Sequence, residues 1–287
     1  MRVLGLTLLT MVAFAANSVL CRMALDGGLI DAGSFSALRL ATGALMLVAI
    51  AAATRRGAGR QPGGGWVSGL LLALYAVPFS FAYVALDAGT GALVLIGAVQ
   101  ITMITAAVLG GERPRPLVWC GMALAAAGLL VLLAPGLAAP SPVGAALMGV
   151  AGLGWGLYSL RGRAAGDPVA RTAAAFVRAT PVALGCGLVA LGLRGASVAH
   201  LSARGIALAS FSGAVTSGLG YVAWYRVLPQ LSTTGAAVVQ LSVPVLAAIG
   251  GVLFIAEAIT PRLAMAASMI LGGIGLVLRV RSGAPRS

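Results

Sequence analysis

The sequence predicts an all-α membrane protein with ten transmembrane helices, arranged as two inverted five-helix repeats around a central cavity. Three observations support this fold class. The 287 residues are 60% hydrophobic and only 9% charged, with a mean hydropathy of +1.04, whereas about a quarter of the residues of a soluble domain are charged. Ten apolar stretches approach the length of about 20 residues that one bilayer crossing needs. The two halves of the chain also resemble each other, as described below.

The ten stretches are predicted to be helices, because lipid offers the peptide backbone no hydrogen-bond partner outside its own segment. The first, Val3–Ala24, follows Arg2 and has the form of a signal peptide. Its removal would delete one member of the repeat, so we expect it to remain as a helix. The other spans of the first half are Gly33–Ala53, Trp66–Leu86, Gly89–Leu109 and Pro116–Leu133.

The second half begins with a well-marked helix start, since Ser141 supplies a hydroxyl N-cap directly before Pro142 in the first turn. Thr260 and Pro261 repeat this arrangement at the start of the last span. The ten spans together leave no stretch long enough for a separate soluble domain. Those of the second half are Pro142–Leu160, Thr172–Leu193, Ile206–Leu228, Ser232–Ile255 and Pro261–Val280.

All 19 basic residues are arginines, and their positions predict the orientation of the spans. With the N-terminus inside, about thirteen arginines lie near inner span ends and about four near outer ones, as the positive-inside rule requires. We therefore expect a multi-pass protein of the cytoplasmic (inner) membrane with both termini cytoplasmic. Arginines at span ends also meet lipid headgroups, which explains the net charge of +13 without a nucleic-acid partner. The outer arginines are Arg22, Arg194, Arg204 and Arg262.

An internal repeat relates the two halves. Residues 86–116 align without gaps to residues 231–261, so that Glu112 matches Glu257 and Pro116 matches Pro261. The chain therefore divides into a first repeat, residues 1–136, and a second repeat, residues 137–287. Because five is odd, the second repeat enters the membrane upside down, an arrangement typical of secondary transporters. A chance resemblance between apolar segments is the alternative. Further matches pair Phe14 with Trp155, Ser18 with Ser159, and Arg39 with Arg178.

Several motifs of the second half carry a family resemblance: Tyr221-Val222-Ala223-Trp224-Tyr225, Leu241-Ser242-Val243-Pro244-Val245, Gly251, Glu257-Ala258-Ile259-Thr260 and Gly272-Gly273-Ile274-Gly275. They resemble the second repeat of EamA transporters, in the drug/metabolite transporter superfamily. The first copy, with Gly111-Glu112-Arg113, is a weaker match. The resemblance implies a ten-helix exporter or permease of amino acids and other small metabolites, without identifying the solute. The family often has proline in both copies at the position of Pro244, where the first copy here has Val99.

Two arginines lie inside the predicted spans, where charged groups are costly and suggest function. Arg39 and Arg178 are each about seven residues from a span end, roughly 10 Å deep. We expect two symmetry-related ion pairs, Arg39–Glu257 on the outside and Arg178–Glu112 on the inside, which break alternately as gates open. The alternative is that each arginine reaches the headgroups and each glutamate lies in a solvated loop.

The acidic residues and the single histidine, His200, lie at helix ends or in loops, so no proton relay is visible at the midplane. Proton coupling would have to use Glu112 or Glu257. Neither clustered metal ligands nor a nucleophile with its base appears in the sequence, so we expect no enzyme activity, metal or cofactor.

Uncharged polar and aromatic residues concentrate in the first, third, fourth, sixth, eighth and ninth spans, which we expect to surround the cavity. For individual residues the alternatives are bonds to the residue's own helix, helix-to-helix bonds or interfacial belts. Pro244 and Pro78 are the candidate hinges, since proline removes a backbone hydrogen bond. The candidate substrate-binding residues are Asn17, Tyr75, Phe79, Gln100, Trp155, Tyr158, Tyr221, Trp224 and Gln240.

These features predict a secondary transporter that moves small metabolites, first of all amino acids or related amphipathic compounds, by alternating access. Export is the direction that the family resemblance implies. A multidrug-type exporter and a non-transporting membrane scaffold or sensor are the alternatives. The expected partners are a small-molecule substrate and the lipid bilayer, with protons added only if transport is proton-coupled through Glu112 or Glu257. The sequence leaves the oligomeric state open.

Overall fold

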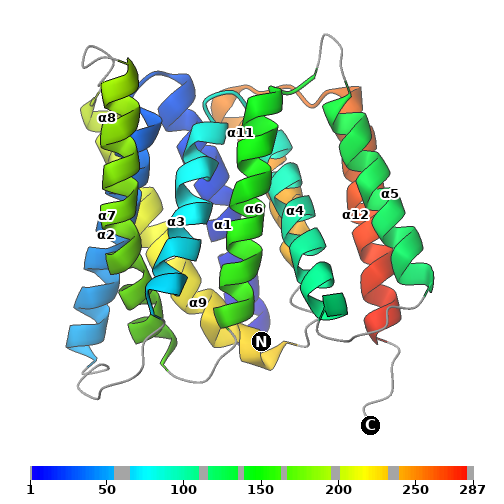
Figure 1. Ribbon diagram of the computed structural model, residues 1–287, viewed down its shortest axis with the longest axis horizontal. Helices are drawn as coiled ribbons and strands as arrows, with labels where there is room; N and C mark the ends of the chain where they lie inside the picture. The colour runs from blue at the N-terminus through cyan, green and yellow to red at the C-terminus, as the bar shows by residue number, and fades with distance from the viewer. Residues whose placement is uncertain are drawn as a thin grey trace.

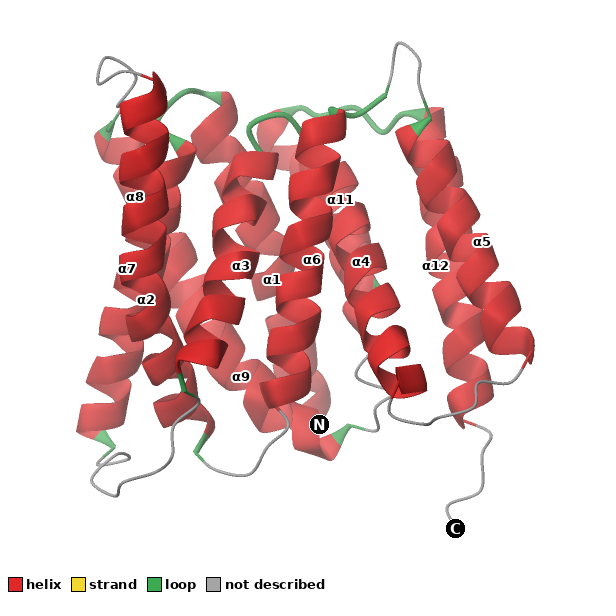
Figure 2. Ribbon diagram, in the orientation of Figure 1, coloured by secondary structure: helices red, strands yellow, loops and turns green. Residues whose placement is uncertain are grey.

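The computed structural model describes residues 2–54, 65–109, 116–134, 139–162, 167–194, 201–231 and 239–282. In these ranges the chain is helical, apart from connecting loops and a single β-bridge between Ile30 and Leu201 (Figure 2). Seven helices are long and apolar enough to cross a membrane, and three more are apolar but shorter. The predicted all-α membrane fold is confirmed, and each predicted span corresponds to one of these segments.

The first half contains five helices, each close to its predicted span. Two of the shorter apolar helices lie in the second half, at Ser242–Ile255 and Pro261–Leu276, and the third is α3. The predicted bounds of α5 agree with the structure at both ends. The helices are α1 (Arg2–Asp26), α2 (Ala32–Ala53), α3 (Trp66–Ala82), α4 (Ala88–Leu109) and α5 (Pro116–Leu133).

The second half has a more broken course. Its eighth predicted span consists of four consecutive pieces, α8, η2, α9 and η3, of which η2 is a π-helix. The elements are α6 (Pro142–Gly162), α7 (Pro168–Arg194), α8 (Ala203–Phe211), η2 (Ser212–Leu219), α9 (Gly220–Val227), η3 (Leu228–Gln230), α11 (Ser242–Ile255) and α12 (Pro261–Ser282).

The helices stand side by side. On one side of the bundle α5 packs against α12, and on the opposite side α2 packs against α7 (Figure 1). Between them, α6 packs against α3 and α4, and α1 packs against α11 and α9. The start of α1 and the end of α12 lie at the same end of the bundle, which we call the terminal end. The opposite end is called the distal end.

The outer surface of the bundle is apolar. Leu109 and Leu193 are 82% and 83% exposed, and Leu253 and Phe254 on α11 are also exposed. A surface of this kind would aggregate in water but is what a lipid environment requires. It identifies a multi-pass membrane protein.

Glycines on α6 allow α4 to approach closely. A Cβ on Gly152 would lie 2.7 Å from the Leu95 carbonyl oxygen, and one on Gly156 would lie 2.9 Å from Thr102. Small residues at such positions let helix backbones touch in membranes. This contact fixes α6 so that Trp155, between the two glycines, is buried in the bundle.

The two candidate hinge prolines have different settings. Pro78 lies inside α3, as expected. Pro244 lies in the first turn of α11, directly after a turn at Leu241 that separates it from the helical residues Val239 and Gln240. Pro244 is therefore not in the middle of a continuous helix, because the turn at Leu241 interrupts the helix before the proline.

Candidate functional site

A narrow cavity lies at the centre of the bundle. Its volume is only about 20 Å³. That is room for one or two water molecules. Six of the nine predicted substrate-binding residues line it: Asn17, Tyr75, Phe79, Trp155, Tyr221 and Gln240. Its other lining residues are Phe14, Ser18, Leu95, Ile96 and Val243.

The three remaining candidates, Gln100, Tyr158 and Trp224, are buried but do not line this cavity. Within the described residues, the Gln100 Nε2 and Trp224 Nε1 donors have no hydrogen-bond partner. The sequence did not single out Phe14 as a lining residue, although its alignment with Trp155 was visible. Phe14 makes edge-to-face contacts with Trp155 and Tyr221, at centroid separations of 5.6 and 5.7 Å.

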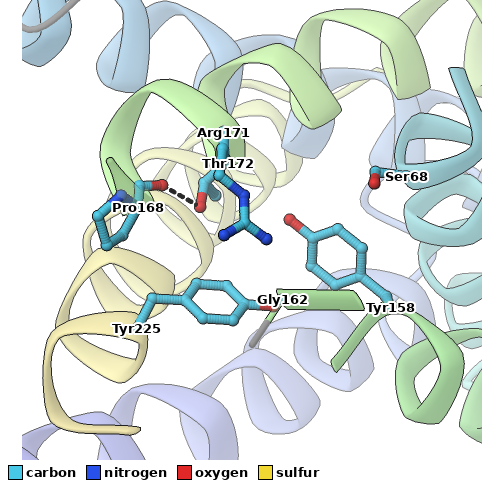
Figure 3. Close-up of a pocket in the computed structure, with 7 residues that line it drawn as sticks. All are labelled: Ser68, Tyr158, Gly162, Pro168, Arg171, Thr172 and Tyr225. Atoms are coloured by element: carbon cyan, nitrogen blue, oxygen red, sulfur yellow. Dashed lines mark hydrogen bonds between the residues drawn. The ribbon is translucent and has the colours of Figure 1, made fainter. Parts of the chain in front are cut away.

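Tyr158 instead lines a second pocket near the terminal end, shown in Figure 3. There the guanidinium group of Arg171 projects toward the space between Tyr158 and Tyr225, and its Nη2 donates to the Arg161 carbonyl oxygen at 2.9 Å. The pocket is completed by Ser68, Gly162, Pro168 and Thr172.

Aromatic rings connect this pocket with the central cavity and the distal end. Each ring contacts the next, with centroid separations of 4.8 to 6.2 Å. Such separations are those of tilted and edge-to-face pairs. The aromatic column, as we call it, runs from Tyr83 through Phe79, Tyr75, Trp155 and Tyr158 to Tyr225.

Arg39 lies directly behind the wall of the central cavity and is 1% exposed. Its Nη2 donates to the hydroxyls of Tyr75 and Tyr221 at 2.8 and 3.4 Å. Its Nε donates to the Ser217 hydroxyl at 3.0 Å. The guanidinium carbon is 4.8 Å from the ring centroid of Phe79, a cation–π contact.

The expected Arg39–Glu257 ion pair is not formed, because these two side chains have other partners. The sequence gives the position of Arg39 along α2 but not its rotation about the helix axis, which turns it toward the aromatic residues. Glu257 is bound by Arg22 instead, with 3.3 Å between Oε1 and Nε. Arg22 lies at the distal end of α1, and its position in the sequence predicts only that it is on the outer side.

Asn17 links the cavity to the π-helix η2. Its Oδ1 accepts hydrogen bonds from the hydroxyls of Ser212, Thr216 and Ser217. The wider π turn brings these hydroxyls to one side of the helix, and π turns often occur at functional sites. Gly213 permits the arrangement, because a Cβ there would overlap the Arg39 carbonyl oxygen.

Arg22, Asp26, Asp87 and Glu257 form a charged cluster at the distal end, which we call the distal cluster. Arg22 Nη2 lies 2.7 Å from Asp26 and 3.8 Å from Asp87. The Glu257 carboxylate also accepts from the backbone N–H of Ala88, at the start of α4. Burial raises the pKa of Glu257, as does the nearby charge of Asp87, while the Ala88 bond and Arg22 act to lower that pKa.

The second predicted pair is Arg178–Glu112. Glu112 lies outside the described residues, and so does His200. Arg178 is partly buried on α7, and its Nη1 donates to the Ala174 carbonyl oxygen at 3.1 Å. Within the described residues, no group of three His, Cys, Asp or Glu side chains could hold a metal ion.

Three comparisons bear on the identity of the chain. Residues 142–279 match the model of the EamA-like transporter family. The uncharacterized protein PA1977 of Pseudomonas aeruginosa is 51% identical over 282 residues, which cover 98% of this chain and 96% of that protein. A solved crystal structure shares the fold, with a TM-score of 0.67 and 21% identity over 99% of both chains. With its helical bundle and apolar outer surface, the chain belongs to the EamA-like transporter family.

Proposed function

We propose that the protein is a secondary transporter that moves small metabolites across the cytoplasmic membrane by alternating access, in the direction of export. The observation that carries the proposal is the central cavity. It is lined by residues of both halves, with Asn17 and Tyr75 from the first and Trp155 and Tyr221 from the second. A carrier needs such a site between two halves that can move relative to each other.

The packing of the helices supports an inverted repeat, residues 1–136 and 137–287. In such a repeat α1 corresponds to α6, α2 to α7, α3 to the α8–α9 segment, α4 to α11 and α5 to α12. Contacts should then occur in matched sets. The contact of α3 with α6 is matched by that of α1 with α9 and η2, and the contact of α4 with α6 by that of α11 with α1. The contacts of α2 with α7 and of α5 with α12 relate equivalent helices.

Alternating access requires that each end of the cavity can close. The distal cluster supports closure there, because Arg22 binds both Glu257 of the α11–α12 loop and the carbonyl oxygens of Tyr83 and Val84. Two positions are the candidate hinges: the turn at Leu241 that interrupts the helix before Pro244, and Pro78 in α3. The arginine distribution supports cytoplasmic termini, and hence a distal end that faces outward.

The proposal is tested by counterflow in proteoliposomes with a panel of labelled amino acids. We expect accumulation of one class of solute, and its loss in Asn17→Ala and Gln240→Ala. Ser268→Ala is the matched control, because Ser268 is exposed on α12 and bonds only the Ala264 carbonyl of its own helix. Flux limited to drugs would instead favour a multidrug-type exporter. A complete lack of flux for amino acids, other carboxylic acids, nucleosides, sugars and drugs would favour a scaffold or sensor.

A further inference from the structure

We infer that the central cavity binds the carboxylate group of a small organic acid with an apolar or aromatic body, and that Arg39 determines this choice. Arg39 acts through the side chains that separate it from the cavity, which it turns into hydrogen-bond donors. The inference rests on the proposed function, since it names the substrate class of the same cavity.

The starting point is a buried positive charge without a matching negative one. No carboxylate of the described residues lies within ion-pair distance of Arg39. Its Nη1 has no hydrogen-bond partner in that part of the chain, although the side chain is almost fully buried. A buried cation is costly unless something compensates its charge. The faces of Tyr75 and Phe79 compensate part of it, which leaves a positive potential at the cavity wall.

Arg39 also fixes the direction of the hydrogen bonds at the two tyrosines. A guanidinium group can only donate. The hydroxyl oxygens of Tyr75 and Tyr221 therefore accept from Nη2. Their own hydrogens must then point elsewhere. The two hydroxyls are also hydrogen-bonded to each other, which uses one of the two hydrogens. Since both residues line the cavity, the other hydrogen is a donor for a group bound there.

A second chain of bonds gives Asn17 the same polarity. Ser217 accepts from Arg39 Nε, so its hydrogen is available to the Asn17 Oδ1, 3.2 Å away. Ser212 and Thr216 donate to the same oxygen. With Oδ1 occupied by three hydroxyls, the amide NH₂ of Asn17 is the group left for the cavity that this residue lines. One tyrosine hydroxyl and the Asn17 amide are thus the donors available to a ligand.

The rest of the lining defines the other end of the ligand. The cavity has no acidic residue among its lining side chains, so an ammonium group would find no counter-charge. Phe14, Phe79 and Trp155 offer ring surfaces to an apolar body, and Leu95, Ile96 and Val243 extend them. A donor-lined, positive pocket with apolar walls favours a monocarboxylate over a neutral or cationic compound of the same shape.

The test compares three probes that share an indole ring and differ in charge: indole-3-acetate, indole-3-acetamide and tryptamine. The cavity as described has room for only one or two water molecules, so a probe of this size binds only when the two halves separate, as alternating access requires. Binding of the probes to the purified full chain in nanodiscs is measured by isothermal titration calorimetry at pH 7. We expect indole-3-acetate to bind at least about tenfold more tightly than the amide, a difference of about 1.4 kcal/mol. Tryptamine should bind most weakly. Tryptamine binding as tight as the acetate, or no binding of the acetate, would overturn the inference.

Three variants assign the preference to Arg39 and its relays. In Arg39→Gln, Tyr75→Phe and Tyr221→Phe, the advantage of the acetate over the amide should shrink severalfold while the affinity for the amide changes little. Tyr83→Phe is the matched control: Tyr83 follows α3 directly, but its hydroxyl donates to the Ala88 carbonyl oxygen, and we expect no change. An equal loss for all three probes in the tyrosine variants would contradict the inference, and these variants decide the question if Arg39→Gln does not fold.

Counterflow of the same probes separates this inference from the proposed function. Binding in the expected order without flux would leave the carboxylate site in place and contradict transport. Flux that favours tryptamine over indole-3-acetate would support transport and overturn the carboxylate site.

Discussion

Arg22 of α1 and Glu257 of the α11–α12 loop form an ion pair, with 3.3 Å between Nε and Oε1. The pair joins the first helix of the chain to the loop that precedes the last helix. The side chains of these residues are only 14% and 11% exposed. The same arginine holds the α3–α4 connection through the carbonyl oxygens of Tyr83 and Val84. One side chain therefore connects three segments at the distal end.

Removing this arginine should destabilise the protein. In Arg22→Gln the largely buried carboxylate of Glu257 loses its cation, and unpaired buried charges are costly. We expect a loss of about 1–3 kcal/mol in the free energy of unfolding, measured by thermal unfolding in detergent. Asp87→Asn is the control: Asp87 lies 3.8 Å from Arg22 and is 55% exposed, so its loss should change stability by less than about 1 kcal/mol. Equal effects of the two variants would show that burial does not decide the strength of the cluster.

The raised pKa of Glu257 predicts a specific pH dependence. Because the pKa is higher in the folded than in the unfolded chain, the folded protein binds more protons at this residue. The resulting stabilisation is complete below the ordinary glutamate pKa of about 4.3 and is lost as the pH rises through the raised value. The midpoint of wild-type thermal unfolding, relative to that of Glu257→Gln, should therefore fall with rising pH across this window. Arg22 and Asp87 act on the same carboxylate, and Arg22→Gln should shift the window upward. Parallel curves for wild type and Glu257→Gln would contradict this assignment.

The close contact between α6 and α4 predicts that Gly152→Ala is disruptive. The added methyl group would lie 2.5 Å from the Ala98 Cβ and 2.7 Å from the Leu95 carbonyl oxygen. Overpacking of this kind costs about 1–3 kcal/mol. Gly149→Ala lies on the same helix with no atom within 4 Å of the new methyl group, so it should be neutral or slightly stabilising, since alanine favours helix. Thermal unfolding of both variants tests the contact, and a stable Gly152→Ala would mean that the helices can separate without cost.

Loss of the Asn17 side chain should leave the buried hydroxyls of Ser212 and Ser217 without their acceptor, whereas Thr216 can still donate to the Ser212 carbonyl oxygen. Ser212, Thr216 and Ser217 all donate to Asn17 Oδ1, and unsatisfied buried groups cost about 1–3 kcal/mol. We expect Asn17→Ala to lower the thermal unfolding midpoint by several degrees. Thr10→Val is the matched control on α1, because the buried Thr10 hydroxyl bonds only the Leu6 carbonyl of its own helix. If both variants lowered the unfolding midpoint equally little, the hydrogen bonds between α1 and η2 would not contribute to stability.

Much of this architecture could be predicted from the sequence because lipid restricts the options so strongly. Apolar runs had to be helices, and proline at the first turn set the starts of α5, α6 and α12. Polar residues within the spans had to face inward, which is why Asn17, Tyr75 and Gln240 were assigned to the cavity and do line it. Phe14 was missed, since a phenylalanine is equally at home in lipid or in a cavity wall.

The features that could not be predicted depend on helix rotation. The position of Arg39 in the sequence gives its depth in the membrane but not which neighbours it faces, so its assignment to Glu257 was wrong. Gln100 and Trp224 were placed at the cavity for their chemistry, and both are buried elsewhere. The π turn of η2 has no distinct sequence pattern in a segment of small and hydroxyl residues.

The π-helix η2 also means that chain length can alter the cavity without any substitution in its wall. A π turn holds one residue more than an α turn. The π-helix η2 therefore sets the rotation of α9 about its axis, and in this rotation Tyr221 contacts Arg39. A relative with one residue fewer between Ser212 and Leu219, wound as an α-helix, would bring a different side chain of α9 to this position. The lining of this cavity can therefore diverge between related proteins through insertion or deletion within a helix.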